Sequence, residues 1–223
     1  MKELVAKEIA AKVKDGDLIG VGTGSTVDLA IDELAKRIVT EKLQVHALPT
    51  SYQTAWRCQQ AGIKVVDPHY RGDLSWGFDG ADAVDSKLRA IKGKGGAMLK
   101  EKIMAVRCRT YYLVIDESKL FSTLEESKCP VPVEVVPEAL SLVEQELARI
   151  GARSVTLRTG SGKHGPIVTE AANLILDAVF PSFSDKLEAE IKSIVGVVES
   201  GLFFGLADYA LVAGKAGVKT LQS

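Results

Sequence analysis

LIGVGTGSTVDLAIDELAKRI, residues 18–38, is the stretch of sequence that decides the fold. Its first four residues form a short apolar run that predicts a β-strand, and the glycine-rich turn GTGST follows at residues 22–26. Apolar residues then recur at helical spacing, at positions 27, 30, 31, 34 and 38. A strand that turns through glycines into a helix is the unit from which α/β proteins are built.

The turn at residues 22–26 offers backbone N–H groups and the positive end of a helix dipole to an anion, and Thr23, Ser25 and Thr26 add hydroxyl groups. No Gly-Lys-Ser/Thr follows the glycines, which argues against a P-loop. The next predicted strand, at about residues 44–48, lacks the acidic residue that binds a ribose hydroxyl in dinucleotide folds. We therefore expect a monophosphate ester. Two alternatives stay open: a plain N-cap at Ser25 or Thr26, and glycines that only permit a tight turn.

WGFDGADAVD, residues 76–85, places Asp79 and Asp82 just beyond the end of another predicted strand, at residues 76–78. In open α/β sheets ligands bind outside the carboxyl ends of the strands, so these carboxylates are candidates for catalysis. A turn rich in Asp and Gly for backbone reasons is one alternative. A magnesium site is another, which ranks below the other two interpretations.

IKGKGGAMLKEKIMA, residues 91–105, is a second glycine-rich turn that runs into a helix from about Gly96. The spacing predicts that Leu99, Ile103 and Val106 form the packing stripe and that Glu101 points away from it. The helical neighbours of Glu101 are small or thioether residues: Ala97, Met98, Met104 and Ala105. A carboxylate on such a face tends to have its pKa raised by desolvation, which suits a general base. The alternative is a glutamate favoured only by the helix dipole.

The second half of the chain has a different pattern. An apolar run at residues 111–115 predicts a central strand that delivers Lys119, either to an anionic or polyol site or to a solvated loop. From about residue 128 the order strand, helix, strand, strand, helix, strand matches the ferredoxin-like pattern. We predict a Rossmann-like, largely parallel α/β domain of residues 1–127 and 206–223, and a smaller ferredoxin-like α+β domain of residues 128–205.

Composition narrows the class of protein. The 223 residues carry a net charge of −1, which argues against a nucleic-acid or membrane partner. Three cysteines lie far apart in no ligand spacing, which favours reduced thiols over disulfides or zinc. The first residues lack a signal-peptide core, and no apolar run approaches a membrane span. We expect a cytoplasmic protein.

The chain resembles the ribose-5-phosphate isomerases of type A. The resemblance rests on four motifs that occur in this order: GTGST, DGAD, IKGKGG and KEKI. The likeness extends along essentially the whole chain, through DESK at residues 116–119, PVEVVP at 132–137 and GVKTL near the terminus. The resemblance implies reversible conversion of ribose 5-phosphate to ribulose 5-phosphate without a metal or other cofactor, in cytoplasmic homodimers or dimers of dimers.

The resemblance also implies roles for individual residues. Glu101 would be the base that moves a proton between C2 and C1, and Asp79, Asp82 and Lys92 would assist ring opening and stabilise the enediolate. The remaining matched positions would bind substrate: Lys2, Thr23, Gly24, Ser25, Thr26, Gly80, Ala81, Gly93, Lys94, Gly95 and Lys119.

Two positions depart from the family pattern. Lys94 interrupts the glycine run, and a lysine there loses the freedom of positive φ and adds a cation. Ala83 replaces the acidic residue that often follows DGAD.

Other functions compete with the isomerase. Sugar-phosphate deaminases and CoA transferases resemble this outline, and the latter use a glutamate nucleophile. A sugar-phosphate-binding regulator is a third option, but it would normally add a DNA-binding helical domain, for which the chain has neither the length nor the charge.

Overall fold

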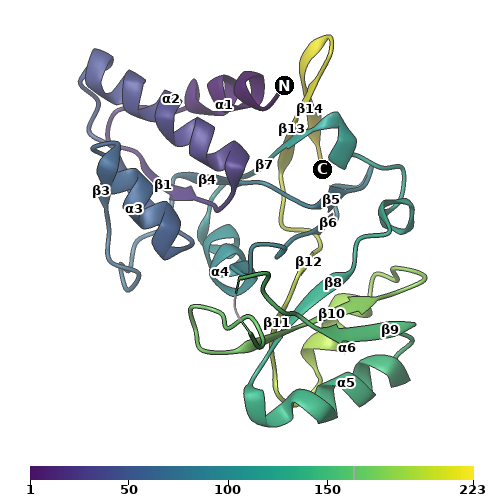
Figure 1. Cartoon of the computed structure of the whole chain (residues 1–223). Coiled ribbons are helices and arrows are strands. Elements are labelled where there is room, and N and C mark those ends of the chain that lie inside the picture. Colours follow the sequence, from purple (N-terminus) through teal and green to yellow (C-terminus); the bar gives the residue numbers. More distant parts are fainter. Residues whose placement is uncertain (163) are drawn as a thin grey trace. The chain divides into compact units, whose positions relative to one another are not determined.

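The computed structural model describes residues 1–162 and 164–223 (Figure 1). Contacts divide the chain into two compact units. Unit 1 comprises Met1–Ala81, Lys100–Leu120 and Gly205–Ser223, and unit 2 comprises Asp82–Leu99 and Phe121–Phe204.

Unit 1 is built on a seven-stranded sheet in the order β14-β13-β7-β4-β1-β2-β3, in which only β14 runs antiparallel to its neighbour. Its strands are β1 (Leu18–Val21), β2 (His46–Pro49), β3 (Lys64–Val65), β4 (Trp76–Asp79), β7 (Tyr111–Asp116), β13 (Tyr209–Gly214) and β14 (Gly217–Gln222). The strand order reverses between β1 and β4, which is the Rossmann-like switch point where ligands bind in such sheets. The predicted largely parallel α/β fold is confirmed.

Successive side chains of a strand point to opposite faces of the sheet, so both faces carry residues on which helices can pack. Helices cover both faces of this sheet. Helices α1 (Lys2–Ala10) and α2 (Ser25–Glu41) pack on the face that carries Ile19, Val21 and Phe78. The opposite face of β1 and β4 carries glycines, and α4 (Met98–Arg107) lies against it (Figure 1). Helix α3 (Tyr52–Gln60) packs beside β2 and β3.

Unit 2 contains a four-stranded antiparallel sheet in the order β11-β8-β10-β9. Its elements are β8 (Val131–Val135), α5 (Leu140–Arg149), β9 (Ser154–Leu157), β10 (Leu174–Val179), α6 (Leu187–Lys192) and β11 (Val197–Ser200). Both helices pack on one face, where Val133, Val143 and Ile191 share a hydrophobic core. This order of elements is the ferredoxin-like pattern that the sequence predicted.

A small three-stranded sheet explains where unit 2 begins. It joins β5 (Ala83–Val84), β6 (Ala90–Ile91) and β12 (Leu202–Phe203). Ala83, Ile91 and Leu124 are buried in the same core as β8. Residues 82–99 and 121–127 therefore group with unit 2, whereas the division drawn from sequence placed them with residues 1–81. That the two units are separate folding domains stays a prediction.

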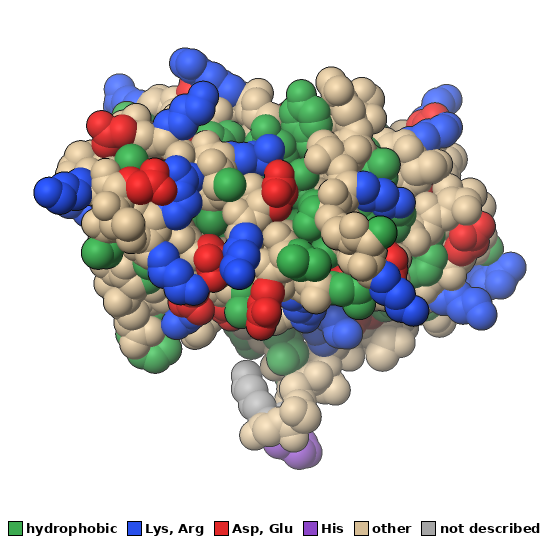
Figure 2. Space-filling model, turned by 90° about the horizontal axis from the view of Figure 1, so that it is seen from above, with side chains coloured by type: hydrophobic (Ala, Val, Ile, Leu, Met, Phe, Trp, Pro, Cys, Tyr) green, Lys and Arg blue, Asp and Glu red, His purple; other side chains and the backbone are tan. Residues whose placement is uncertain are grey.

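Basic and acidic side chains are interspersed on the face seen in Figure 2, as the net charge of −1 suggests. Within the described residues, every helix is too short or too polar to span a lipid bilayer.

Candidate active site

Glycines in two adjacent strands allow α4 to lie close to the sheet of unit 1. A side chain at Gly20 of β1 or Gly77 of β4 would overlap the sulfur atoms of Met104 and Cys108. Met104 lies on α4, and Cys108 directly follows the last residue of that helix. Because Gly20 and Gly77 have no side chains, they determine which face of α4 packs on the sheet.

Glu101 lies on that buried face. It precedes Met104 by three residues, and its side chain is only 4% exposed. Of its four predicted helical neighbours, Met98, Met104 and Ala105 are also buried, and Ala97 is partly buried.

The packing stripe predicted for α4 is wrong. Ile103 is 50% exposed, Val106 is 67% exposed, and Leu99 is only partly buried. The physical reason is that the glycine strands accept the Met104–Cys108 face, and helical spacing alone does not say which of two apolar faces packs inward.

Asp79 is the last residue of β4, not part of the turn beyond it, and it is fully buried. Its Oδ1 accepts hydrogen bonds from the backbone N–H groups of Thr23, at 3.0 Å, and Gly80, at 2.7 Å. A side chain at Gly22 would overlap its carboxyl group, so glycine is required there for this contact. Two backbone N–H donors thus hold this carboxylate in place.

Tyr111 is a buried residue near the two carboxylates that the sequence analysis missed. It stands beside Gly77 in the register of β4 and β7, on the face of the sheet that meets α4. Burial raises the pKa of Tyr111 well above 10, and the negative charges of Asp79 and Glu101 raise it further. Its hydroxyl has no hydrogen-bond partner among the described residues. Asp79 and Glu101 therefore act on the same buried phenol, one from the sheet and one from the helix.

The hydroxyl group of Thr23 belongs to a cluster that the sequence analysis also missed. Thr23 Oγ1 lies 2.8 Å from Thr50 Oγ1, 2.9 Å from Ser51 Oγ and 3.1 Å from Thr54 Oγ1. Thr54 Oγ1 donates in turn to the carbonyl of Gly22 at 2.9 Å. A sequence signal was present, since Thr50 and Ser51 directly follow β2, but only the fold brings these hydroxyls together.

The first turn of α2 keeps its anion-binding features. The N-cap is Gly24, with φ of 137°, so neither Ser25 nor Thr26 caps the helix. Ser25 Oγ accepts a hydrogen bond from Lys2 Nζ at 2.8 Å. The unpaired N–H groups of a helix start, with a lysine close by, suit a phosphate.

The remaining candidates in unit 1 lie at the ends of strands. Lys119 ends a short 3-10 helix, Glu117–Lys119, directly after β7 and is partly buried. Gly80 and Ala81 follow β4 and are also partly buried.

Unit 2 holds the other candidates, around the turn at residues 92–95. Lys92 is 3% exposed, and its Nζ lies 5.5 Å from the centre of the Phe203 ring. Asp82 Oδ2 accepts a hydrogen bond from the backbone N–H of Lys94 at 3.0 Å.

Lys94 does not strain this turn. Positive φ angles fall on Gly93, at 96°, and Gly96, at 77°, while Lys94 and Gly95 are outside that region. The Lys94 side chain is exposed. Lys94 interrupts the run of glycines at a position that does not need a positive φ, so the turn can keep its backbone conformation.

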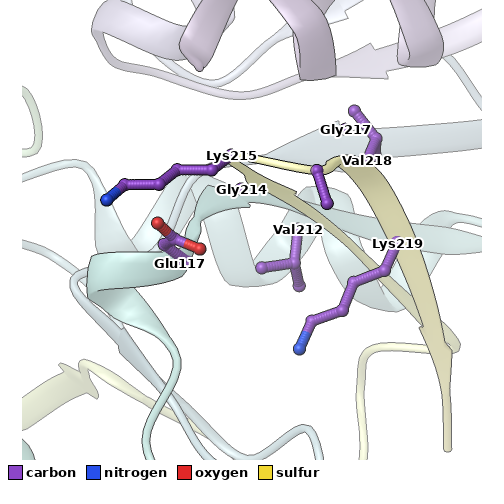
Figure 3. A pocket seen from close by; sticks show the side chains of 8 residues that line it. Glu117, Val212, Gly214, Lys215, Gly217, Val218 and Lys219 are labelled. Atoms are coloured by element: carbon purple, nitrogen blue, oxygen red, sulfur yellow. The ribbon is translucent and has the colours of Figure 1, made fainter.

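Figure 3 shows a different pocket of unit 1, of about 310 Å³, beneath the tip of the β13–β14 hairpin. Its lining includes Glu117, Lys215 and Lys219, and none of the candidate site residues is among the side chains that line it. The candidate site is therefore not this pocket.

Comparison with known proteins shows which enzyme class and which protein family the chain belongs to. The family model described as ribose 5-phosphate isomerase A (phosphoriboisomerase A) matches residues 46–217, which places the chain among the isomerases. The chain belongs to the ribose-5-phosphate isomerase A family.

Individual relatives agree with this assignment over nearly their full length. The chain is 44% identical to ribose-5-phosphate isomerase A of Methanocaldococcus jannaschii over 226 residues, covering 100% of this chain and 97% of the relative. The counterpart from Methanothermobacter thermautotrophicus is 40% identical over 224 residues, with 100% and 97% covered.

Solved structures of ribose-5-phosphate isomerases also superpose closely on this chain. The M. jannaschii structure superposes with a TM-score of 0.95 at 42% identity, covering 100% of this chain and 98% of that one. A D-ribose-5-phosphate isomerase in complex with phospho-erythronic acid gives a TM-score of 0.95 at 37% identity, with 100% and 97% covered.

Proposed function

We propose that this chain is a metal-independent aldose–ketose isomerase that interconverts D-ribose 5-phosphate and D-ribulose 5-phosphate through an enediolate. It would serve the non-oxidative pentose phosphate pathway in the cytoplasm. Family membership supports the overall reaction. The observation that carries the mechanism is the buried Glu101 on the face of α4 that meets the sheet strand ending in Asp79.

Glu101 is the proposed base. Isomerisation of the open-chain aldose removes the proton on C2 and returns a proton to C1, so one carboxylate in reach of both carbons suffices. A buried carboxylate beside thioether and small side chains is poorly solvated, and desolvation makes a carboxylate more basic. The proton that Glu101 takes from C2 is the one it returns to C1, unless it exchanges with solvent between the two steps.

Asp79, Asp82 and Lys92 are proposed to assist ring opening and to offset charge on the enediolate oxygens. Ring opening needs a proton moved from the C1 hydroxyl to the ring oxygen, which carboxylates can relay. A buried lysine ammonium donates to an oxyanion without solvent reorganisation, and one such donor typically contributes about 3 kcal/mol.

The turn formed by Thr23, Gly24, Ser25 and Thr26 is proposed to bind the phosphate, with Lys2 beside it. Gly80, Ala81, Gly93, Lys94, Gly95 and Lys119 are proposed to contact the sugar. Binding energy from the phosphate orients the reacting carbons toward the base. The bound phospho-erythronic acid of the solved relative, a phosphorylated sugar acid, supports this ligand class.

The decisive experiment compares Glu101→Gln with Glu144→Gln, a control at an exposed glutamate of α5. We expect Glu101→Gln to lose turnover of ribose 5-phosphate while inorganic phosphate still binds, and Glu144→Gln to match the wild type. Reaction in deuterated water should place deuterium at C1 of the ribulose 5-phosphate to the extent that the proton on Glu101 exchanges with solvent between the two steps. Near wild-type turnover by Glu101→Gln would show that the base is wrong. Loss of wild-type activity after dialysis against a chelator, with recovery on adding a divalent metal, would contradict metal independence.

We also propose that the chain forms a homodimer or a dimer of dimers. Large apolar side chains stand exposed on α3, where Tyr52 is 70% and Trp56 is 55% exposed, and on α4 at Ile103 and Val106. Exposed apolar groups of this size favour protein association. Light scattering should give at least twice the chain mass of 23.9 kDa, and a monomer at micromolar concentration would contradict the proposal.

A further inference from the structure

Arg158 connects the ferredoxin-like sheet of unit 2 to the glycine-rich turn, although 64 residues separate it from Lys94. It follows β9 directly, and its backbone is fixed on both sides. Its N–H donates to the carbonyl of Ile175 at 2.9 Å, and its carbonyl accepts from the N–H of Ile167 at 2.9 Å. The side chain therefore starts from a rigid position.

Asp177 of β10 aligns the guanidinium group. Arg158 Nε donates to Asp177 Oδ2 at 2.8 Å, and Nη2 donates to Asp177 Oδ1. Both side chains are largely buried, at 15% and 23% exposed. Such a two-point pair fixes the plane of the guanidinium, which a lysine could not reproduce.

The remaining nitrogen of the guanidinium points at the turn. Arg158 Nη1 donates to the carbonyl of Gly93 at 2.8 Å and to the carbonyl of Lys94 at 3.0 Å. The Gly93 carbonyl also accepts from the N–H of Gly96 at 3.0 Å, so both of its lone pairs are used. On the other side of the turn, the N–H of Lys94 donates to Asp82. The turn is thus held through its carbonyls by Arg158 and through an N–H by Asp82.

We propose that Arg158, aligned by Asp177, is a positioning residue for isomerisation that holds the turn at residues 92–95 in its active conformation. This inference rests on the proposed function. Arg158 acts on Lys92 and Asp82 through the backbone between them and does not itself take part in proton transfer. The turn has two glycines with positive φ, whose backbones are intrinsically mobile, so an external clamp is needed to define their conformation.

The test compares Arg158→Met and Arg158→Lys with Arg149→Met, in which an exposed arginine of α5 that pairs with Glu146 is changed in the same way. For each variant, kcat, KM, the inhibition constant of inorganic phosphate and the thermal midpoint are measured. We expect kcat of Arg158→Met to fall about 10- to 100-fold, because small displacements of reacting groups have effects of this size. The inhibition constant of phosphate should stay within about 2-fold, since the proposed phosphate turn lies in unit 1, and Arg149→Met should match the wild type.

Two further measurements separate positioning from a purely structural role. Guanidinium ion at millimolar concentration should restore part of kcat to Arg158→Ala. If Arg158→Met does not fold, Asp177→Asn, which keeps the arginine but loosens its alignment, should still lower kcat with little change in KM. If Arg158→Met or Asp177→Asn folds and its kcat is within about 2-fold of the wild type, the inference about Arg158 is wrong, while the proposed function still stands. A wild-type chain without isomerase activity overturns the inference and the proposed function together.

Discussion

The backbone N–H of Thr23 donates a hydrogen bond to Oδ1 of Asp79 at 3.0 Å, so the proposed phosphate turn and a proposed catalytic carboxylate are held by the same residue. The side chain of Thr23 is meanwhile fixed by the hydroxyls of Thr50, Ser51 and Thr54. A hydroxyl with three such neighbours has little capacity left for a ligand. We infer that Thr23 contributes its backbone and its position, and that the phosphate is bound mainly by the residues that follow it.

Thr54→Val tests this cluster. The change removes the donor to the Gly22 carbonyl and one neighbour of Thr23, leaving buried polar groups unsatisfied. We expect the free energy of unfolding to fall by about 1–3 kcal/mol, and the inhibition constant of inorganic phosphate to rise. Urea unfolding and inhibition kinetics measure the two effects. Thr40→Val, at an exposed threonine of α2, is the control and should change neither. Equal behaviour of the two variants would argue against a role for the cluster.

Gly77→Ala tests the close approach of α4. The added methyl group would overlap Cys108 and Met104, and overpacking of this kind costs about 1–3 kcal/mol. We expect lower stability together with lower kcat, because the displaced helix carries Glu101. Cys108→Ala in the same chain should recover part of both by making room. Gly162→Ala, where an added methyl group meets open space, should be neutral. Wild-type stability of Gly77→Ala would show that the helix is not held by this contact.

Tyr111→Phe removes a buried hydroxyl that has no partner among the described residues. Loss of an unsatisfied polar group avoids a desolvation cost of about 1–3 kcal/mol. We therefore expect this variant to be at least as stable as the wild type in urea unfolding. A loss of more than about 1 kcal/mol would mean that the hydroxyl has a partner, such as a bound water.

Stability should decline in alkaline solution because of the buried thiols. Burial raises the pKa of Cys58 and of Cys108 from 9.0 to about 12. The unfolded chain loses these protons above pH 9 while the folded chain keeps them, so the stabilising contribution is complete below pH 9 and is lost as pH rises toward 12. The slope is at most about 1.4 kcal/mol per pH unit for each thiol.

Unfolding in urea under reducing conditions, between pH 8 and pH 11, measures this loss. Tyr111, whose pKa is also raised by burial, adds to it above pH 10. Replacing both cysteines by alanine should flatten the slope between pH 9 and pH 10. An unchanged slope in the double variant would contradict the assignment to the thiols.

Local sequence determined the elements and their order. The alternation of strands and helices, the glycine turn before α2 and the ferredoxin-like pattern of residues 128–205 were all readable, because hydrophobic period and turn chemistry are properties of neighbouring residues. The same holds for the buried residues Met98, Met104 and Ala105, which are helical neighbours of Glu101.

Tertiary structure decided what distant segments do to one another. The face of α4 that packs inward was set by Gly20 and Gly77 in two other strands, and the exposed Ile103 and Val106 show that periodicity alone gave the wrong face. The hydroxyl cluster joins residue 23 to residues 50–54, and Arg158 reaches a turn 64 residues earlier in the chain. Such contacts depend on the register and order of strands, which no window of the sequence contains.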